Sequence, residues 1–490
     1  MKTRTLIIGL VSSTLTAAAL LATGGAGPTA ADSSTAYTVR WAPCPEAPRV
    51  QCGTLSVPLD WSRPRGERVR VAVARRPADD PAHRVGTLFY NPGGPGDNST
   101  RYVIGAEGIF SAALRARFDI VAIDPRATGG SAQVHCNVPV LTPTGTLFPR
   151  TRAQFEALLR HNREVGASCL HGTGPLLGHV DTVTLARDHE ALRAALGEKT
   201  VTWFGVSYGT QLAANYAELY PQRTRAMVLD AALEHSLPEV VQVADEIMSS
   251  EASFNRFATW CTTAPACALR GQDVAAVFDR LVRNADRHPI PVQGAMRPVT
   301  GEDIRMGAVG LLRFKEPVRL APGLSWPDLS QALVRALAGD ASAFALPPAD
   351  VVQDGLLSQL AIACMDYAPQ IRTYAQMRQR ITMARQLAPH LQGASETWRV
   401  NYCIGWPLAP SNPPRRLDVR GVPALMVHAV HDSSDPYSWA HSLAAQIRGI
   451  ALLTRTGDGH TSYHTSPCAR AAIDQYLIRP QAPPDRICDE

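Results

Sequence analysis

The chain has 490 residues, of which 45% are hydrophobic and 19% are charged, a balance typical of a folded globular protein rather than a disordered one. This length suffices for one large domain with an insertion or for two domains. The formal net charge of +5 is small for the length, so electrostatics gives no reason to expect nucleic acid as a partner.

The N-terminus has the pattern of an export signal. Lys2 and Arg4 precede an apolar run over residues 6–22, and small residues follow it. We therefore predict a cleavable signal peptide over residues 1–31 and a secreted mature protein. An uncleaved membrane anchor is the alternative, but the run is short and weakly hydrophobic for a span of about 20 residues, so we expect no stable anchor.

Ten cysteines agree with export, because disulfides form and persist in oxidising compartments. Pairing them in chain order would give five local bridges, although the sequence does not decide the pairing. Zinc ligation is the alternative, but the cysteines lack the tight Cys-x-x-Cys or Cys/His spacing of such sites, and we expect no metal. The cysteines are Cys44, Cys52, Cys136, Cys169, Cys261, Cys267, Cys364, Cys403, Cys468 and Cys488.

The first predicted strands form an antiparallel pair at the edge of a sheet. Residues 54–61 and 68–74 alternate larger apolar residues with polar or small ones, and Pro64 and Gly66 between them supply a turn. Short apolar runs separated by helical stretches follow, which is the pattern of parallel strands. These runs cover residues 86–90, 118–124, 201–206, 226–230, 422–430 and 449–454.

The strand rhythm is interrupted between residues 235 and 415, where the sequence is helical and rich in loops. An insertion at this point would lie above the carboxyl ends of the strands, where open α/β sheets bind ligands. We predict an α/β fold with a mostly parallel central sheet and a helical cap inserted after the sixth strand. The predicted parts are the signal peptide over 1–31, the core over 32–234 and 416–490, and the cap over 235–415.

A nucleophilic serine is predicted at Ser207. The apolar run 201–206 stops at Gly205-Val206-Ser207-Tyr208-Gly209, and a helix-like pattern follows. A strand that turns sharply into a helix needs small residues on both sides of the turn, and the strained turn exposes the serine hydroxyl. This is the nucleophile elbow of an α/β-hydrolase. An ordinary serine in a tight turn is the alternative interpretation.

A base is predicted at His460, just past the last strand, because the nucleophile, the acid and the histidine follow one another in this order in the fold. His464 is its nearest rival. The acid is expected after the strand that ends at residue 430, and both Asp432 and Asp435 lie there. Asp432 comes sooner after the strand and is preferred, whereas Asp435 could be a turn residue before proline.

The oxyanion hole requires two backbone N–H groups. We expect one from Tyr208, directly after the nucleophile, and the other from Gly94 in the turn Asn91-Pro92-Gly93-Gly94-Pro95-Gly96. The glycines would let a reacting carbonyl approach the backbone. A plain surface turn is the alternative for this segment taken alone.

These segments together resemble a known family. With residues 57–61, 124–126 and 228–230, they are similar to the secreted tripeptidyl aminopeptidases in the proline-iminopeptidase group of the α/β-hydrolases. The similarity extends over nearly the whole mature chain, including a tripeptidyl-aminopeptidase-like C-terminal region. It implies that Ser207, Asp432 and His460 are the catalytic triad, because Asp435 takes the position of a threonine in the family motif.

Three departures from the family lie beside the expected site. Asp97-Asn98-Ser99 stands where relatives usually have Gly-Ser-Gly, residues 127–130 depart from the usual Gly-x-Gly-x-Ser after Arg126, and Asp435 replaces threonine. The choice of substrate could therefore differ from that of the family although the triad is intact.

The resemblance also implies an anion that holds the substrate ammonium. Four acids of the predicted cap are near enough in sequence, namely Glu239, Asp245, Glu246 and Glu251. Glu251 takes the position of a family glutamate and is the predicted ligand of the substrate N-terminus. The alternative is that all four lie on solvated helix faces.

We therefore predict a monomeric, secreted serine exopeptidase that works without a cofactor. It would release short peptides, tripeptides by resemblance, from free N-termini through an acyl-enzyme on Ser207. An esterase or amide hydrolase with the same triad is the alternative. A binding protein on a hydrolase scaffold is a third hypothesis, against which the intact triad argues.

Overall fold

The computed structural model describes residues 37–490, apart from positions 143, 320, 396–397, 484–485 and 490. The signal peptide predicted over residues 1–31 lies outside the described residues. Among the helices that the structure describes, none combines the length and the apolar character that crossing a bilayer requires.

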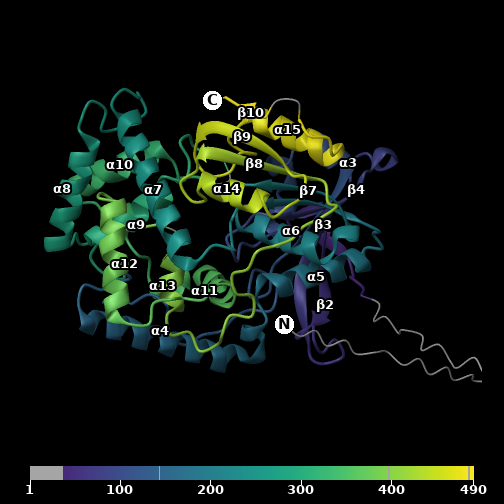
Figure 1. Cartoon of the computed structure of the whole chain (residues 1–490), viewed down its shortest axis with the longest axis horizontal. Helices are drawn as coiled ribbons and strands as arrows, with labels where there is room; N and C mark the ends of the chain where they lie inside the picture. Colours follow the sequence, from purple (N-terminus) through teal and green to yellow (C-terminus); the bar gives the residue numbers. More distant parts are fainter. Residues whose placement is uncertain (1–36, 143, 320, 396–397, 484–485, 490) are drawn as a thin grey trace, which may run out of the picture. The chain divides into compact units, whose positions relative to one another are not determined.

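One sheet runs through the described part of the chain, with the strand order β1-β2-β3-β5-β4-β6-β7-β8-β9-β10 (Figure 1). Strands β1 to β3 are antiparallel, β3 joins β5 antiparallel, and the pairs from β5 to β10 are parallel. The strands are β1 (Ala42–Cys44), β2 (Ala47–Pro58), β3 (Arg68–Arg76), β4 (Gly86–Asn91), β5 (Phe118–Ile123), β6 (Val201–Val206), β7 (Thr224–Asp230), β8 (Ala424–His431), β9 (Ala451–Asp458) and β10 (Ile487–Cys488).

The predicted mostly parallel sheet is confirmed, with differences at its edges. The antiparallel pair is present as β2 and β3, with Leu55 opposite Val71. It is not the edge, because β1 adds one more strand outside β2, and β10 adds one beyond β9. Strands β1 and β10 are very short, and their sequences lack the alternating apolar pattern from which a strand could be predicted.

Helices cover both faces of the sheet because neighbouring residues of each buried strand point to opposite sides. Trp203 packs in a cluster with residues of α5 (Thr182–Ala195), α6 (Tyr208–Leu219) and α14 (Tyr437–Ala444). The next residue, Phe204, packs on the other face with residues of α1 (Thr100–Ile104), α2 (Ala106–Ile109), α3 (Ala112–Arg117) and α15 (Pro467–Ile478). These two layers hold the carboxyl ends of the strands in place.

Helices α7 to α13 lie between β7 and β8, as expected of a helical insertion (Figure 1). Most of them share a separate apolar cluster built around Phe254, Phe278 and Trp326. The boundaries 235 and 415 of a separate cap stay a prediction. The helices are α7 (Glu239–Cys261), α8 (Val274–Arg287), α9 (Gly301–Leu311), α10 (Trp326–Leu337), α11 (Ala349–Asp366), α12 (Tyr374–Leu387) and α13 (Trp398–Cys403).

The long helix α4 (Arg152–Thr173) precedes the elbow in sequence but packs with this insertion. Phe155 and Leu158 share a cluster with Met377 and Ile381 of α12. In turn, α11 and α13 contribute to the main core through Leu360 and residues near it. The insertion is therefore joined to the sheet by apolar packing.

Five disulfides pair the cysteines in chain order, which confirms the pattern of local bridges. They join Cys44 to Cys52, Cys136 to Cys169, Cys261 to Cys267, Cys364 to Cys403 and Cys468 to Cys488. The last of these ties α15 to β10, and the fourth ties α11 to α13.

The turn between β6 and α6 is so tightly packed that two of its positions have no room for a Cβ atom. Ser207 has φ 54° and ψ −126°, a conformation that side-chain-bearing residues rarely adopt. A Cβ at Gly205 would lie 2.3 Å from the Gly209 carbonyl oxygen, and one at Gly209 would lie 2.4 Å from the Asn91 carbonyl oxygen. Only glycine fits at these two positions of the Gly-x-Ser-x-Gly motif.

A buried ion pair joins helix α5 to the segments that follow β2 and β5. The Arg126 guanidinium contacts the Asp188 carboxylate at 2.7 and 2.8 Å, and both side chains are almost fully buried. Arg126 also donates to the carbonyls of Pro58 and Leu59, and the Trp61 indole donates to Asp188. The Asp-Pro-Arg segment thus has a scaffold role.

We predict that Arg126→Met destabilises the fold, because it leaves the Asp188 carboxylate buried without its cation. The free energy of unfolding should fall by about 3–5 kcal/mol, as is usual when one partner of a buried pair is removed. Denaturant unfolding followed by tryptophan fluorescence measures this. Arg63→Met, which removes an exposed partner of Asp60, is the matched control and should have little effect. Equal effects of the two variants would contradict the scaffold role.

We also predict that Gly209→Ala disturbs the elbow, because the new Cβ meets backbone atoms that cannot move aside alone. The variant should lose about 1–3 kcal/mol of stability and most of its activity. Gly310→Ala in α9 is the control, since nothing lies within 4 Å of a Cβ there. A Gly209→Ala enzyme with normal stability and activity would refute this account of the motif.

Candidate active site

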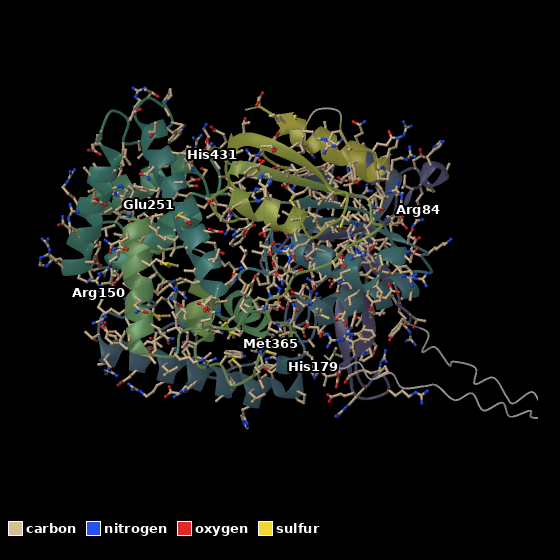
Figure 2. All side chains as sticks on the ribbon, in the orientation of Figure 1. Arg84, Arg150, His179, Glu251, Met365 and His431 are labelled. Atoms are coloured by element: carbon tan, nitrogen blue, oxygen red, sulfur yellow. A yellow bond between two sulfur atoms is a disulfide. The ribbon has the colours of Figure 1, made fainter. Side chains whose placement is uncertain are left out.

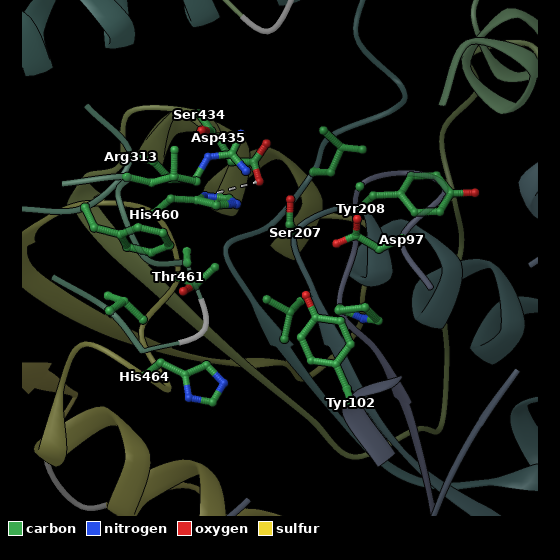
Figure 3. Close-up of a pocket in the computed structure, with 18 of the residues that line it drawn as sticks. Asp97, Tyr102, Ser207, Tyr208, Arg313, Ser434, Asp435, His460, Thr461 and His464 are labelled. Carbon is green, nitrogen blue, oxygen red and sulfur yellow. Dashed lines mark ion pairs between the residues drawn. The ribbon is translucent and has the colours of Figure 1, made fainter. Parts of the chain in front are cut away.

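A pocket with a cavity volume of about 180 Å³ opens where β4, β6, β8 and β9 end (Figure 3). Its wall includes most of the residues predicted from sequence and two more carboxylates. The polar wall residues used below are Gly94, Asp97, Ser207, Tyr208, Asp435 and His460. Over the part of the chain that the structure describes, no group of three or more His, Cys, Asp or Glu residues is arranged to hold a metal ion.

Ser207 lies at the N-terminus of α6, where its backbone is held from two sides. Its N–H donates to the carbonyl of Asp230 at the end of β7, at 2.9 Å. Its carbonyl accepts from the backbone N–H and the hydroxyl of Thr210, at 2.8 and 2.6 Å. These bonds keep the strained residue in place and leave its hydroxyl in the pocket wall.

His460 and Asp432 form a buried pair. The Nδ1 atom of His460 lies 3.0 and 2.9 Å from the two carboxylate oxygens of Asp432. Asp432 also accepts from the backbone N–H groups of Ser434 and Asp435, at 2.8 and 3.0 Å. The geometry therefore favours Asp432 over Asp435, whose nearest carboxylate oxygen lies 3.9 Å from the same nitrogen.

The electrostatics of the pair agree with this arrangement. Burial alone would lower the pKa of His460, but the Asp432 carboxylate outweighs burial and raises this pKa above its ordinary value. Burial alone would raise the pKa of Asp432, and the His460 ring outweighs it in the opposite direction. His464, the rival base, also lines the pocket, but burial lowers its pKa to about 4.

Ser207 and His460 share the pocket wall, and the His460 ring points toward Ser207 (Figure 3). Within the described residues no hydrogen bond joins the two side chains directly. Contacts between a nucleophile and its base are often long in the absence of substrate and shorten when substrate binds. Ser207 and His460 thus line one pocket without a direct hydrogen bond between their side chains in the described structure.

The glycine turn after β4 packs directly against the elbow. A Cβ at Gly93 would lie 2.9 Å from the Ser207 Cβ and 3.2 Å from the Tyr208 backbone nitrogen. The next residue, Gly94, lines the pocket. The Asn91 side chain accepts from the N–H of Gly93 at 3.0 Å and so braces the turn. The Tyr208 side chain is buried, and its hydroxyl pairs with Thr182 at 2.6 Å.

Asp230 connects the nucleophile to the base, a role that sequence reasoning missed. Its carbonyl accepts from Ser207, and its fully buried carboxylate accepts from the backbone N–H groups of Ser462 and Tyr463, at 2.8 to 2.9 Å. Because Ser462 lies two residues after His460, one side chain anchors the loop that carries the base. Its sequence signals were its position at a strand end and its place in segment 228–230, which shares the family resemblance.

The helical insertion holds the loops that carry the acid and the base. The Ser249 hydroxyl of α7 donates to the Asp432 carbonyl, and the His460 N–H donates to the Arg313 carbonyl at 2.8 Å. Arg256 of α7 pairs with Asp458 at the end of β9. Residues of the 313–324 segment also line the pocket, which no motif in the sequence indicated.

The structure does not bring Glu251 to this pocket, contrary to expectation. Glu251 lies within the helical insertion (Figure 2), is 4% exposed, and accepts from the backbone N–H groups of His390 and Leu391 at 3.1 and 3.0 Å. Of the other acids considered, Glu239 pairs with Arg380, and Asp245 accepts from the indole of Trp439. Both oxygens of Glu251 are therefore engaged in stabilising a turn.

Comparisons with known proteins agree with the fold and the chemistry. The family described as alpha/beta hydrolase fold matches residues 86–298, and the family described as TAP-like protein matches residues 389–488. Serine protease Hip1 of Mycobacterium tuberculosis is 30% identical over 476 residues, which cover 91% of this chain and 90% of that protein.

Two further relatives have different names. Tripeptidyl aminopeptidase of Streptomyces lividans is 28% identical over 452 residues, covering 88% of this chain and 81% of that protein. A protein named Carboxylesterase B from Mycobacterium tuberculosis is 28% identical over 475 residues, which cover 89% of this chain and 86% of that protein. Since similarity at this level extends over nearly the full length of these proteins, the chain is a serine hydrolase with the α/β-hydrolase fold and belongs to the tripeptidyl aminopeptidase-like family.

Proposed function

We propose that this serine hydrolase is a secreted exopeptidase that removes short peptides, tripeptides in the first instance, from free N-termini. The observation that carries the proposal is the buried His460–Asp432 pair, which shares one pocket with the serine of a strained elbow. The two relatives named as a serine protease and a tripeptidyl aminopeptidase support a peptide substrate.

The mechanism follows from the roles of these groups. Ser207 Oγ attacks the scissile carbonyl while His460 accepts its proton, and Asp432 keeps the imidazole oriented and stabilises its cation. The backbone N–H groups of Tyr208 and Gly94 are proposed to hold the oxyanion, with Tyr208 in the first turn of α6, where the helix dipole favours negative charge. His460 then protonates the leaving amine, and water hydrolyses the acyl-enzyme.

Export is part of the proposal. Five disulfides and no described free cysteine support an oxidising compartment, where such bridges persist. The proposed signal peptide would deliver the chain there.

An esterase with the same groups is the second candidate. The relative named Carboxylesterase B favours it, and an ester would use the same nucleophile, base and oxyanion donors. Leaving-group chemistry separates the two candidates, because an amide needs protonation of its departing nitrogen and an activated ester does not.

We predict that Ser207→Ala lowers kcat by about 10⁴-fold or more, because the nucleophile is lost. Chromogenic mono-, di- and tripeptide anilides are assayed beside short acyl esters. Ser62→Ala, an exposed serine in the turn after β2, is the control and should retain full activity. Ester hydrolysis without any anilide hydrolysis by the unaltered enzyme would refute the exopeptidase proposal and favour the esterase.

The pH dependence of kcat/KM tests the roles of the two aspartates. His460 must be neutral to accept a proton, and its pKa is raised above the ordinary 6.5, so activity should fall as the pH drops through a value above 6.5. Asp432→Asn removes the charge that raises this pKa. In this variant, the fall of kcat/KM on the acidic side of the pH profile (the acidic limb) should therefore move to lower pH. The value of kcat should also drop by about 10⁴-fold.

Asp435→Asn is the matched comparison. Its carboxylate also raises the pKa of His460 but lies farther from Nδ1. This variant should move the acidic limb less than Asp432→Asn and retain most of the activity. If Asp435→Asn abolishes activity and Asp432→Asn does not, the assignment of the acid is wrong.

A further inference from the structure

The pocket contains a carboxylate that the reaction as proposed does not use. Asp97 follows the glycine turn, lines the pocket, and lies on the opposite side of Ser207 from His460 (Figure 3). Its side chain is directed toward the cavity that also contains Ser207.

In the described part of the chain, no side-chain donor lies within hydrogen-bond distance of the Asp97 carboxylate, and no cation lies within 4.0 Å of it. Burial and the nearby Asp97 carboxylate together raise the pKa of Tyr102, which also lines the pocket. Arg101, four residues farther along the chain, interacts electrostatically with Asp97 but donates its hydrogen bond to the Tyr102 hydroxyl at 3.1 Å. Among the described residues, the Asp97 carboxylate therefore has no directly bonded partner.

The carboxylate is held on a braced loop rather than a mobile one. A Cβ at Gly94 would lie 3.6 Å from the Asp97 carboxyl carbon, and one at Gly93 would lie 2.9 Å from the Ser207 Cβ. Beyond Asp97, the backbone N–H of Thr100 donates to the buried Asp124 carboxylate at 2.8 Å. The loop thus fixes the Asp97 carboxylate three residues beyond Gly94, the proposed oxyanion donor.

A negative charge at this point opposes the reaction unless it is neutralised. Negative charge develops on the substrate oxygen in the transition state, and like charges repel strongly in a pocket shielded from water. The other side of the pocket is balanced, because Asp435 and Arg313 shift the pKa of His460 in opposite directions. A cation supplied by the substrate would remove the repulsion and would gain a charge-assisted hydrogen bond.

The size of the cavity limits where that cation sits on the substrate. The volume of about 180 Å³ is below the roughly 300–1,000 Å³ of common ligand pockets, so the cavity suits about one residue of the substrate. If several residues precede the scissile bond, the N-terminal ammonium of the substrate would lie outside the cavity, because each extended residue adds about 3.3–3.6 Å between the ammonium and the scissile carbonyl. The cation must therefore belong to the residue whose carbonyl is attacked.

We propose that Asp97 determines specificity by binding a protonated amine on the residue whose carbonyl Ser207 attacks. The amine is either the α-ammonium of a single N-terminal residue or the cationic end of a basic side chain. This proposal rests on the proposed peptidase function. A basic side chain is compatible with the release of tripeptides, whereas recognition of the α-ammonium would narrow the activity to the release of single N-terminal residues. The usual family pattern has glycine at this position, so the subsite is a feature of this chain.

Two matched pairs of p-nitroanilides test the proposal. Alanine and N-acetylalanine p-nitroanilide differ in the α-ammonium, and Ala-Ala-lysine and Ala-Ala-norleucine p-nitroanilide differ in the side-chain amine. For each pair, kcat/KM of the substrate that carries the amine is divided by kcat/KM of the substrate that lacks it. This ratio is then compared between wild type, Asp97→Asn and Asp97→Gly. Because the same ratio is measured in each enzyme, differences in substrate size cancel.

For the pair that carries the recognised amine, both variants should lower the ratio by about 10- to 100-fold, the effect of losing a hydrogen bond to a charged group. A decrease confined to the alanine pair identifies the α-ammonium, and one confined to the lysine pair identifies the basic side chain. Glu107→Gln removes an exposed carboxylate of α2 that is outside the pocket, and it should leave both ratios unchanged.

If both variants have the same ratio as the wild type in both pairs, the Asp97 subsite is wrong, but the proposed peptidase function is unaffected. If the wild-type enzyme cleaves none of the four anilides, the peptidase function and this subsite fail together. The isosteric Asp97→Asn and the family-like Asp97→Gly guard against misfolding, because a folding defect lowers both members of a pair equally and leaves their ratio unchanged.

Discussion

The strained backbone of Ser207 is the constraint on which the rest of the site depends. A non-glycine residue in this region costs about 1–3 kcal/mol, and it persists only where the surroundings over-determine it. Here α6 leaves no room for a Cβ at Gly205, and the end of β4 leaves none at Gly209. Asp230 and Thr210 hold the peptide groups of Ser207 on either side. The turn must form for the hydroxyl to face the pocket at all.

Asp230 extends this constraint to the base. Its carbonyl binds the N–H of Ser207, and its carboxylate binds two N–H groups just beyond His460. Burial raises the pKa of Asp230, and the donated N–H groups counteract that effect. The predicted nucleophile and base therefore share one anchor at the end of β7, which lies beside β6 in the sheet and is separated from β9 by β8. This is how a site assembled from loops distant in sequence keeps its geometry.

The helical insertion binds the loops that carry Asp432 and His460. Ser249 and Arg313 bind the backbone at Asp432 and His460, and Arg256 pairs with Asp458. A shift of the insertion would thus disturb the acid and the base directly. The same insertion closes the pocket with the 313–324 segment, while the opposite wall carries Asp97. If Ser207, Asp432 and His460 form the triad, we expect these two walls to select among substrates.

The sequence by itself determined the parts of this protein that depend on local pattern. Strand periodicity predicted the antiparallel pair and the parallel strands that follow it, and the glycine spacing predicted the elbow, because a crowded turn admits few residues. The order of motifs along the chain also placed His460 and Asp432 next to each other. Only the tertiary structure decided which acids are already engaged: Glu251 accepts hydrogen bonds from a distant turn, whereas Asp97 faces the pocket with no hydrogen bond or ion pair to its carboxylate among the described residues. The physical reason is that a carboxylate's role depends on the donors that surround it, and those donors come from segments that only folding brings together.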